Sequence, residues 1–376
     1  MSNSPSRFLS LDVFRGMTVC FMIIVNTPGS GATPFAPLLH AAWHGFTVTD
    51  LVFPAFLFAV GNALSFTKGR QANESGVFLK ILKRTAWIFI LGYLLYWFPY
   101  FKADETGQLI LKPISETRIF GVLQRIALCY FFAALMIHYL SSKKIIILST
   151  LFLLGYWIIL LLFGDPADPY SMLGNAGHYL DKFLIGESHL SKGEGVPFEA
   201  QGILSTMPAV VLVIIGYFAG KFIQEKGKNY ESIAKVLLVG AVMIFIALCW
   251  DSVLPINKKL WTGSFILLTS GLNLVILAGL LYIVEIKTWN WGNWTYFFTV
   301  FGKNPLFIYL LAEVLSRVFS LIKIGGDTSL RSLLSKSIFQ NIAPGPLGSL
   351  LFAISFMLMC WLVGLWMDKN RIYIKV

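Results

Sequence analysis

The stretch Ile145-Ile146-Ile147-Leu148-Ser149-Thr150-Leu151-Phe152-Leu153-Leu154-Gly155-Tyr156-Trp157-Ile158-Ile159-Leu160-Leu161-Leu162-Phe163 decides the fold class of this chain. It contains no charged residue, and a helix of about 20 apolar residues is long enough to cross the hydrocarbon core of a bilayer. Runs of similar character cover Ile203 to Phe222, Leu260 to Val284 and Leu347 to Met367. The sequence therefore predicts a polytopic α-helical membrane protein.

The composition of the whole chain agrees with this prediction. Its 376 residues are 56% hydrophobic and only 13% charged, whereas a soluble domain carries about 25% charged residues. We expect an all-α bundle of about ten transmembrane helices, which form a single domain over residues 1–376, with no cleaved signal peptide at the start. The predicted spans are Val13–Val25, Leu51–Phe66, Trp87–Phe101, Ile119–Leu140, Ile145–Phe163, Ile203–Phe222, Val236–Trp250, Leu260–Val284, Leu306–Phe319 and Leu347–Met367. The tryptophan-rich segment Trp289 to Phe301 is predicted to lie at the membrane interface.

The basic residues predict how the chain is oriented. The net charge of +11 comes from lysines and arginines scattered through the loops between spans, a pattern typical of membrane orientation and not of nucleic-acid binding. With a cytoplasmic N-terminus, the cytoplasmic loops receive more lysines and arginines than the outer loops, so we expect both termini in the cytoplasm. The loop that carries His40, and the longest loop from Gly164 to Gln201, then face outward.

Two histidines and a carboxylate lie at the join between the first two spans. His40, Trp43, His44 and Asp50 all fall within the stretch His40 to Pro54, and an imidazole can accept or donate a proton near neutral pH. The four-residue spacing of the histidines would also suit zinc, but no third ligand is evident, so we expect no metal site. Asp50 has two interpretations: it caps the second span, or it orients an imidazole for acid–base work.

Other polar residues stand where the bilayer should be apolar. Asp12 and Arg15 form either a structural ion pair on one helix face or part of an anion site. Asn26 either ends the first span before Pro28 or donates its amide to a developing oxyanion. Arg125 faces either a cavity or a buried carboxylate, with Asp12, Asp50 and Glu313 as candidate partners. Three residues before or at the start of the eighth span suit sugar binding, with the ordinary tryptophan belt of the membrane interface as the alternative; these are Asn257, Lys258 and Trp261.

Several of these stretches together resemble the family of the lysosomal heparan-α-glucosaminide N-acetyltransferase and its bacterial relatives. The resemblance runs in order from the first span to the eighth, while residues beyond Trp289 match only in short pieces. The pieces are Ser10-Leu11-Asp12-Val13-Phe14-Arg15-Gly16, Val25-Asn26, His40 through Pro54, Gly121-Val122-Leu123-Gln124-Arg125, Gly202-Ile203-Leu204-Ser205-Thr206 and Ile256-Asn257-Lys258-Lys259-Leu260-Trp261.

The resemblance implies transfer of an acetyl group across the membrane, from cytoplasmic acetyl-CoA to the amine of a terminal glucosamine. The active-site histidine of the family falls on His40 and its accompanying asparagine on Asn26; Asp50 would orient the histidine. Basic residues at the cytoplasmic mouth would hold the phosphates of acetyl-CoA, and Arg125 would line the passage. The predicted acetyl-CoA contacts are Arg7, Arg15, Lys83, Arg84, Arg125 and Lys303, and the predicted acceptor contacts are Trp43, His44, Asn257, Lys258 and Trp261.

Two departures from the family pattern bear on the substrate and the compartment. His44 stands where the lysosomal pattern has asparagine. We also expect the chain to lack the luminal domain of the lysosomal enzyme, which favours an acceptor other than polymeric heparan and a bacterial inner membrane. An amino-sugar transporter and an acyltransferase that acts on a cell-envelope glycan hydroxyl are the alternative functions, and a homodimer is left open. His40 acts either as a general base or as the acetyl carrier.

Overall fold

The computed structural model describes residues 8–66, 76–104, 106–324 and 326–374, and most of these residues are helical. Arg7, one of the predicted acetyl-CoA contacts, lies outside the described residues. The long helices are α1 (Leu9–Asn26), α2 (Val48–Ser65), α4 (Val77–Trp97), α5 (Val122–Tyr139), α6 (Ser142–Phe163), α8 (Thr206–Lys226), α9 (Tyr230–Asp251), α10 (Gly263–Leu280), α12 (Pro305–Leu321) and α15 (Pro346–Lys369). The shorter helices are α7 (Ala176–Ile185), α11 (Trp294–Lys303), α13 (Leu330–Leu334) and α14 (Gln340–Ile342). Strands β1 (Phe101–Ala103) and β2 (Leu109–Leu111) form one antiparallel hairpin, with Phe101 opposite Leu111.

Shorter helical turns link these elements. The 3-10 turns are Ala36–Leu38, Ile114–Glu116, Glu187–His189 and Trp291–Asn293, and the π-helical segments are Leu281–Ile286 and Ser335–Phe339.

The polytopic helical architecture predicted from the sequence is confirmed. Among the described residues, eight helices are long and apolar enough to cross a membrane, or nine if the bent pair α11 and α12 makes one span. The sequence predicted about ten, and the difference lies at α4. This helix has 21 residues, but Lys80, Lys83 and Arg84 lie in its first half, which leaves a short uncharged stretch.

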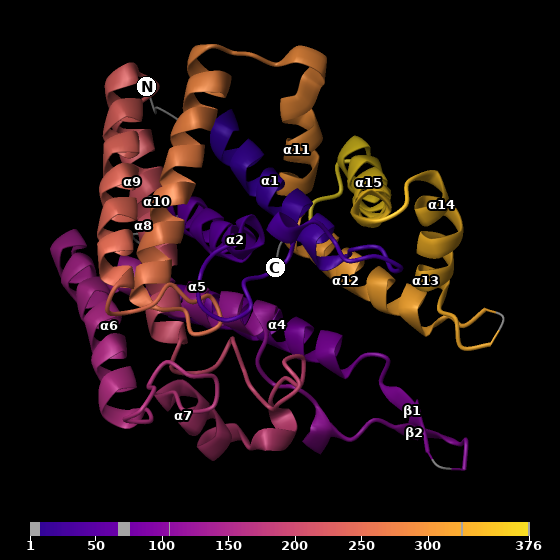
Figure 1. Ribbon diagram of the computed structural model, residues 1–376. Helices are drawn as coiled ribbons and strands as arrows, with labels where there is room; N and C mark the ends of the chain where they lie inside the picture. Colours follow the sequence, from indigo (N-terminus) through magenta and orange to yellow (C-terminus); the bar gives the residue numbers. More distant parts are fainter. Residues whose placement is uncertain (1–7, 67–75, 105, 325, 375–376) are drawn as a thin grey trace.

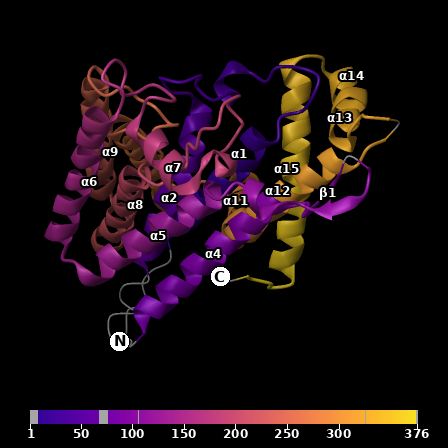
Figure 2. The same ribbon diagram turned by 90° about the horizontal axis from the view of Figure 1, so that it is seen from below.

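The helices form two groups on either side of α1 and α2. In Figure 1, α6, α8, α9 and α10 stand together on one side, and α11 to α15 lie on the other. The second view separates α6 and α9 from α15 at opposite edges of the molecule (Figure 2). Helices α1 and α2 therefore lie between the two groups, and more than half of the residues of each are buried.

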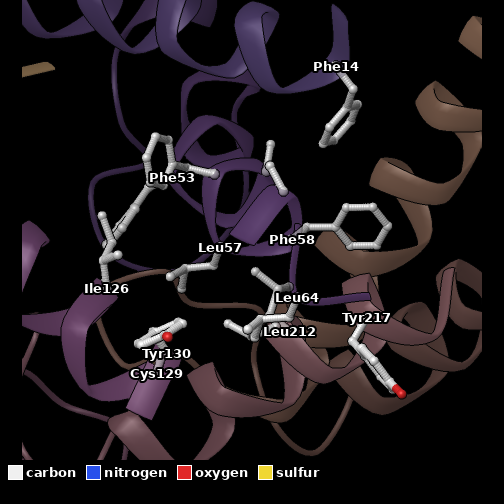
Figure 3. Close-up of a cluster of buried hydrophobic side chains, with 14 of the residues drawn as sticks. Phe14, Phe53, Leu57, Phe58, Leu64, Ile126, Cys129, Tyr130, Leu212 and Tyr217 are labelled. Atoms are coloured by element: carbon white, nitrogen blue, oxygen red, sulfur yellow. The ribbon is translucent and has the colours of Figure 1, made fainter. Parts of the chain in front are cut away.

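The core is closely packed where α2 crosses α8. A Cβ atom on Gly61 would lie 2.0 Å from the carbonyl oxygen of Val213, and one on Gly216 would lie 2.1 Å from that of Phe58. Small residues permit such close backbone approach between membrane helices. Figure 3 shows the large side chains that surround this crossing, including Phe14 from α1 and Tyr130 from α5. These four helices thus form one packed unit.

Only the first part of the segment Trp289 to Phe301 has the exposed tryptophans expected at a membrane interface. Trp291 is 82% exposed, but Phe301, ten residues later, is fully buried. Helix α11 packs against α1, and the chain then bends by 79° at Asn304 into α12. The exposed tryptophans account for the interfacial prediction, while the buried end of α11 belongs to the bundle.

Both described ends of the chain lie at the same end of the bundle. The carbonyl oxygen of Asp12, near the start of α1, lies against Gly302. Two residues later, Asn304 holds the C-terminal strand-like tail, because its Nδ2 donates to the carbonyl of Ile372 and its Oδ1 accepts from the amide of Ile374 (both 2.9 Å). The loops around His40 gather at the opposite end of α1.

Candidate functional site

His40 and Asp50 form the centre of the candidate site. Nδ1 of His40 lies 2.7 Å from Oδ1 of Asp50. The histidine side chain is 47% exposed, while the carboxylate is only 1% exposed. An ionised carboxylate only accepts hydrogen bonds, so this contact is a hydrogen bond when Nδ1 carries a proton. The imidazole that Asp50 contacts in the structure is that of His40.

The local sequence explains why Asp50 is held so firmly. Asp50 is the third residue of α2, and its Oδ2 accepts from the backbone amide and the hydroxyl of Thr47, each at 3.0 Å. The same oxygen accepts from the amide of Ala41 at 3.1 Å. This is a capping box that also captures the loop before it. Asp50 therefore caps α2 and contacts His40 at the same time, and its role as an orienting carboxylate stays a prediction.

Lys258 completes this cluster from a distant part of the chain. Its Nζ lies 2.8 Å from Nδ1 and 3.2 Å from Nε2 of His40, and 3.4 Å from Oδ1 of Asp50. Burial lowers the pKa of Lys258 to about 8, although the neighbouring carboxylate of Asp50 opposes that shift. His40 is thus placed between opposing charges.

Two cavities meet at His40. The His40 cavity has a volume of about 200 Å³ and is polar, and the smaller Asn26 cavity has about 130 Å³. His40, Gln201 and Lys258 line both. The His40 cavity is lined by His40, Ala41, Trp43, Asp50, Arg118, Ser191, Glu194, Phe198, Ala200, Gln201, Lys258 and Lys259. The Asn26 cavity is lined by Met22, Val25, Asn26, His40, Thr49, Val52, Phe53, Val122, Gln201 and Lys258. The structure thus brings His40 and Asn26 to one space.

The wall of the His40 cavity is fixed by ion pairs. Arg118 donates to both carboxylate oxygens of Glu199, at 2.7 and 2.6 Å, and to Oε1 of Gln201 at 2.8 Å. Burial alone lowers the pKa of Arg118, but its bonds to Glu199 raise it above the usual value. Gln201 and Glu199 are site residues that sequence reasoning missed, because a long loop without a motif carries no signal of what it packs against.

Trp43 and Lys259 form the opposite wall. Lys259 donates to the carbonyl of Ala42 at 2.9 Å and to Glu194 at 2.6 Å, and its Nζ lies 5.9 Å from the ring centre of Trp43. Trp43 itself donates to the carbonyl of Tyr170 at 2.9 Å. An aromatic ring beside charged groups is suited to a polar ligand that also has an apolar face.

A third cavity lies near the other end of α1. It has a volume of about 160 Å³, and both Arg15 and Arg84 line it. We call it the Arg15 cavity; its other lining residues are Phe56, Ala59, Val60, Ala63, Leu64, Ile88, Ile126, Tyr130, Pro305 and Leu306. Arg15 also pairs with Asp12 at 2.7 Å, and Arg84 lies 4.8 Å from the ring centre of Tyr130.

The Arg15 cavity and the Asn26 cavity share the same three helices. On α2, Val52 and Phe53 line one cavity and Phe56 lines the other; on α5, Val122 lines one and Ile126 the other. Along α1, Arg15 and Asn26 are eleven residues apart, about 16 Å at the rise of an α-helix. The interface of α1, α2 and α5 therefore lies between a basic cavity and the histidine site.

Six of the predicted contacts within the described residues line none of these cavities: Lys83, Arg125, Lys303, His44, Asn257 and Trp261. Arg125 is fully buried, and its Nη2 donates to the carbonyl of Gly202 at 3.0 Å and to the hydroxyl of Ser205 at 2.5 Å. Its partners are these uncharged groups, not the carboxylates that the sequence suggested. Trp261 is also fully buried, with the Arg125 guanidinium 5.1 Å from its ring centre. Both residues thus support the site from beneath, and neither reaches its surface.

The remaining predicted contacts have structural partners or face outward. Lys303 pairs with Asp368 at 2.7 Å, and Lys83 is exposed on α4. Asn257 is fully buried and donates to Nδ1 of His44 at 3.3 Å, so it holds the His40 loop against the loop before α10. No group of three potential metal ligands occurs among the residues that the structure describes.

Fold and site together define a polytopic α-helical membrane protein with a histidine–carboxylate pair between two cavities at one end of the bundle. The family described as "Heparan-alpha-glucosaminide N-acetyltransferase, catalytic" matches residues 7–249. This match covers well over half of the chain, so the chain belongs to that family.

Two curated relatives have the same name as the family. Heparan-alpha-glucosaminide N-acetyltransferase from Homo sapiens is 26% identical over 379 residues, which covers 85% of this chain and 54% of the human protein. The Mus musculus protein is 26% identical over 377 residues, with 84% of this chain and 55% of the mouse protein covered. The chain thus spans about half the length of these relatives.

Proposed function

We propose that the protein is a transmembrane N-acetyltransferase. It passes an acetyl group from cytoplasmic acetyl-CoA to the amine of a terminal glucosamine or a related amino sugar on the outer side. The observation that carries this proposal is the His40–Asp50 pair, which opens to a polar cavity on one side and to the Asn26 cavity on the other. The family match, and the names of the relatives, point to the same chemistry.

His40 serves as the general base. With Nδ1 donating to Asp50, Nε2 takes a proton from the attacking amine as the C–N bond forms at the thioester carbonyl. The amide of Asn26 donates to the oxygen of that carbonyl as negative charge develops on it. The C–S bond then breaks, and the CoA thiolate receives the proton from His40. In the two-step alternative the imidazole itself accepts the acetyl group before the amine does.

The Arg15 cavity suits the donor. Acetyl-CoA carries phosphate charges that cannot cross the bilayer, and Arg15 and Arg84 offer guanidinium groups that match phosphate oxygens. The start of α12, at Pro305 and Leu306, lines the same cavity, and helix N-termini favour anions. The neutral arm of the molecule would then run along the interface of α1, α2 and α5 to the Asn26 cavity. With the donor bound at this end of the bundle, both termini lie in the cytoplasm. We further propose that residues 1–376 form one catalytic domain and that the protein lies in a bacterial inner membrane.

The His40 cavity suits the acceptor. Trp43 provides an apolar face, and Glu194 and Glu199 provide carboxylates near its wall. Glu194 is paired with Lys259 and Glu199 with Arg118, so this wall offers hydrogen-bonding groups to the hydroxyls and the amine of a sugar, whose apolar face stacks on Trp43. Lys258 and Gln201, which line both cavities, would lie beside the amine as it meets the thioester.

A proteoliposome assay tests this function. The purified protein is reconstituted with labelled acetyl-CoA on one side and glucosamine on the other, and both acetylated and unmodified sugar are measured. We expect acetylated sugar, and we expect His40→Ala to abolish it while His138→Ala, which alters a histidine at the far end of α5, leaves the rate unchanged. Passage of unmodified sugar without acetylation would identify a transporter instead, and acetylation of a glycan hydroxyl but not of glucosamine would identify a different acceptor.

A further inference from the structure

Lys258 places a primary amine inside the candidate site, the same chemical group that the proposed acceptor carries. Its Nζ lies 3.2 Å from Nε2 of His40, and its side chain is only 16% exposed. Lys258 also lines the 130 Å³ cavity that Asn26 lines. An amine, an imidazole and the side chain of Asn26, whose amide donates to Glu313 at 3.4 Å in the structure, therefore line one small space.

We infer that Lys258 is a self-acetylation site, which takes the acetyl group from acetyl-CoA when no acceptor is bound. This inference rests on the proposed function. The neutral Nζ attacks the thioester carbonyl, a C–N bond forms, and the C–S bond breaks. Nε2 of His40 takes the proton that Nζ loses and passes it to the departing CoA thiolate. The products are N-acetyl-lysine and free CoA, so no further reactant is needed.

The charge state of Lys258 is compatible with this attack. Burial lowers its pKa to about 8, with Lys259 acting in the same direction, while Asp50 and Glu194 raise it. At pH 7, about a tenth of the Nζ groups are then neutral. An unperturbed lysine, with a pKa near 10.4, would hold less than about 0.1% of its amine in the reactive form.

Acetylation would change the site in two ways. It removes the positive charge that lies 3.4 Å from Oδ1 of Asp50, and it puts an acetamide into the cavity where the thioester must sit. The modified protein therefore loses transfer to sugars. A bound amino sugar competes with Nζ for the same acetyl group, so the acceptor protects the protein from this modification.

Lys259 is a matched control in the same molecule. It is adjacent in sequence and equally shielded, with 15% side-chain exposure, and it also lines the His40 cavity. Its Nζ is held instead by the carbonyl of Ala42 and by Glu194. Of the described residues that line the Asn26 cavity, Lys258 is the one lysine.

The experiment uses the full chain in proteoliposomes with isotopically labelled acetyl-CoA and no acceptor. Peptide mass spectrometry follows acetylation at Lys258 and Lys259 over time, in the wild type, in His40→Ala and in His40→Gln, with thermal melting to confirm that each variant is folded. We expect Lys258 to be labelled at least about ten times faster than Lys259, and both His40 variants to remove this difference. Glucosamine should slow the labelling, and preincubation with acetyl-CoA should lower the sugar-transfer rate of the wild type in proportion to the fraction of Lys258 that is labelled.

The inference is overturned if both lysines are labelled equally, or if labelling of Lys258 is unchanged in folded His40 variants, since either result indicates simple chemical acetylation. Transfer to glucosamine by a protein whose Lys258 stays unmodified without acceptor also overturns it, but leaves the proposed function intact. Label on His40 in place of Lys258 overturns it and supports the two-step route. Absence of both sugar transfer and lysine labelling refutes the inference and the proposed function together.

Discussion

Replacement of Asp50 by asparagine is the sharpest test of the His40–Asp50 pair, because the change keeps the shape and removes the charge. The carboxylate oxygen lies 2.7 Å from Nδ1 of His40. In an effective dielectric constant of about 20, a protonated imidazole at this distance is attracted by about 6 kcal/mol. The ring of His40 is 47% exposed, so solvent screens part of this attraction. We therefore expect a net loss of about 3 to 5 kcal/mol of transition-state stabilisation, or about 10²- to 10⁴-fold in rate.

A second effect of Asp50→Asn acts in the same direction. An asparagine amide can donate to Nδ1, which would move the ring proton to Nε2 and leave no lone pair there for the amine. The assay is kcat/KM for acetyl transfer to glucosamine in proteoliposomes. Asp165→Asn is the control. Within the described residues, the Asp165 side chain accepts a hydrogen bond only from the loop amide of Ala167, so the kcat/KM of this variant should equal that of the wild type. A folded Asp50→Asn protein within about threefold of the wild-type kcat/KM would refute the role assigned to the pair.

Three further predictions concern the donor, pH and packing. Arg84→Gln should raise KM for acetyl-CoA about tenfold with kcat little changed, because a charge-assisted hydrogen bond contributes about 1.5–3 kcal/mol. Asp181 lies on α7, outside the spans, and burial raises its pKa to about 7. Because this pKa is higher in the folded than in the unfolded state, the folded state binds more protons between about pH 4 and pH 7. The free energy of unfolding therefore falls as the pH rises through that window. Asp181→Asn should flatten this slope in thermal melts. Gly16→Ala should lower the melting temperature, since its Cβ would lie 1.8 Å from the carbonyl oxygen of Phe298, whereas Gly155→Ala, with open space around it, should raise it slightly.

Each of these has a clear contrary outcome. An unchanged KM in Arg84→Gln would remove the Arg15 cavity from the donor site. If Asp181→Asn and the wild type lose melting temperature in parallel from pH 5 to pH 8, another group sets the pH dependence. Equal melting temperatures for Gly16→Ala and Gly155→Ala would mean that α11 moves away from α1 at little cost.

The sequence predicted the fold class because the relevant signal is local. Nineteen uncharged residues from Ile145 to Phe163 need no partner to be recognised as a span, and the structure places α6 over them. The number of spans was harder to predict at two places: α4, where basic residues interrupt the apolar run, and the bend between α11 and α12. There, length and composition alone do not say whether a helix crosses, bends or turns back.

The candidate site likewise contains residues that the sequence predicts and residues whose role only the structure shows. His40, Asp50 and Asn26 could be chosen from the sequence, since His40 and Asp50 lie within ten residues of each other and Asn26 ends the span before them. The roles of Arg125 and Trp261 could not be predicted, because the sequence does not show whether an intramembrane arginine or a tryptophan faces a cavity or the core. Only the packing shows that Arg125 binds the loop carbonyl of Gly202.

The sequence by itself therefore determined that this chain crosses a membrane many times, that it belongs with the acetyltransferases of its family pattern, and that a histidine loop follows the first span. Tertiary structure alone decided which groups meet that histidine. Lys258 is 218 residues away from His40 in the chain, and Arg118 is 81 residues from Glu199. Contacts over such separations depend on how the helices pack. Packing energy is spread over many small contacts, so no single stretch of sequence records it.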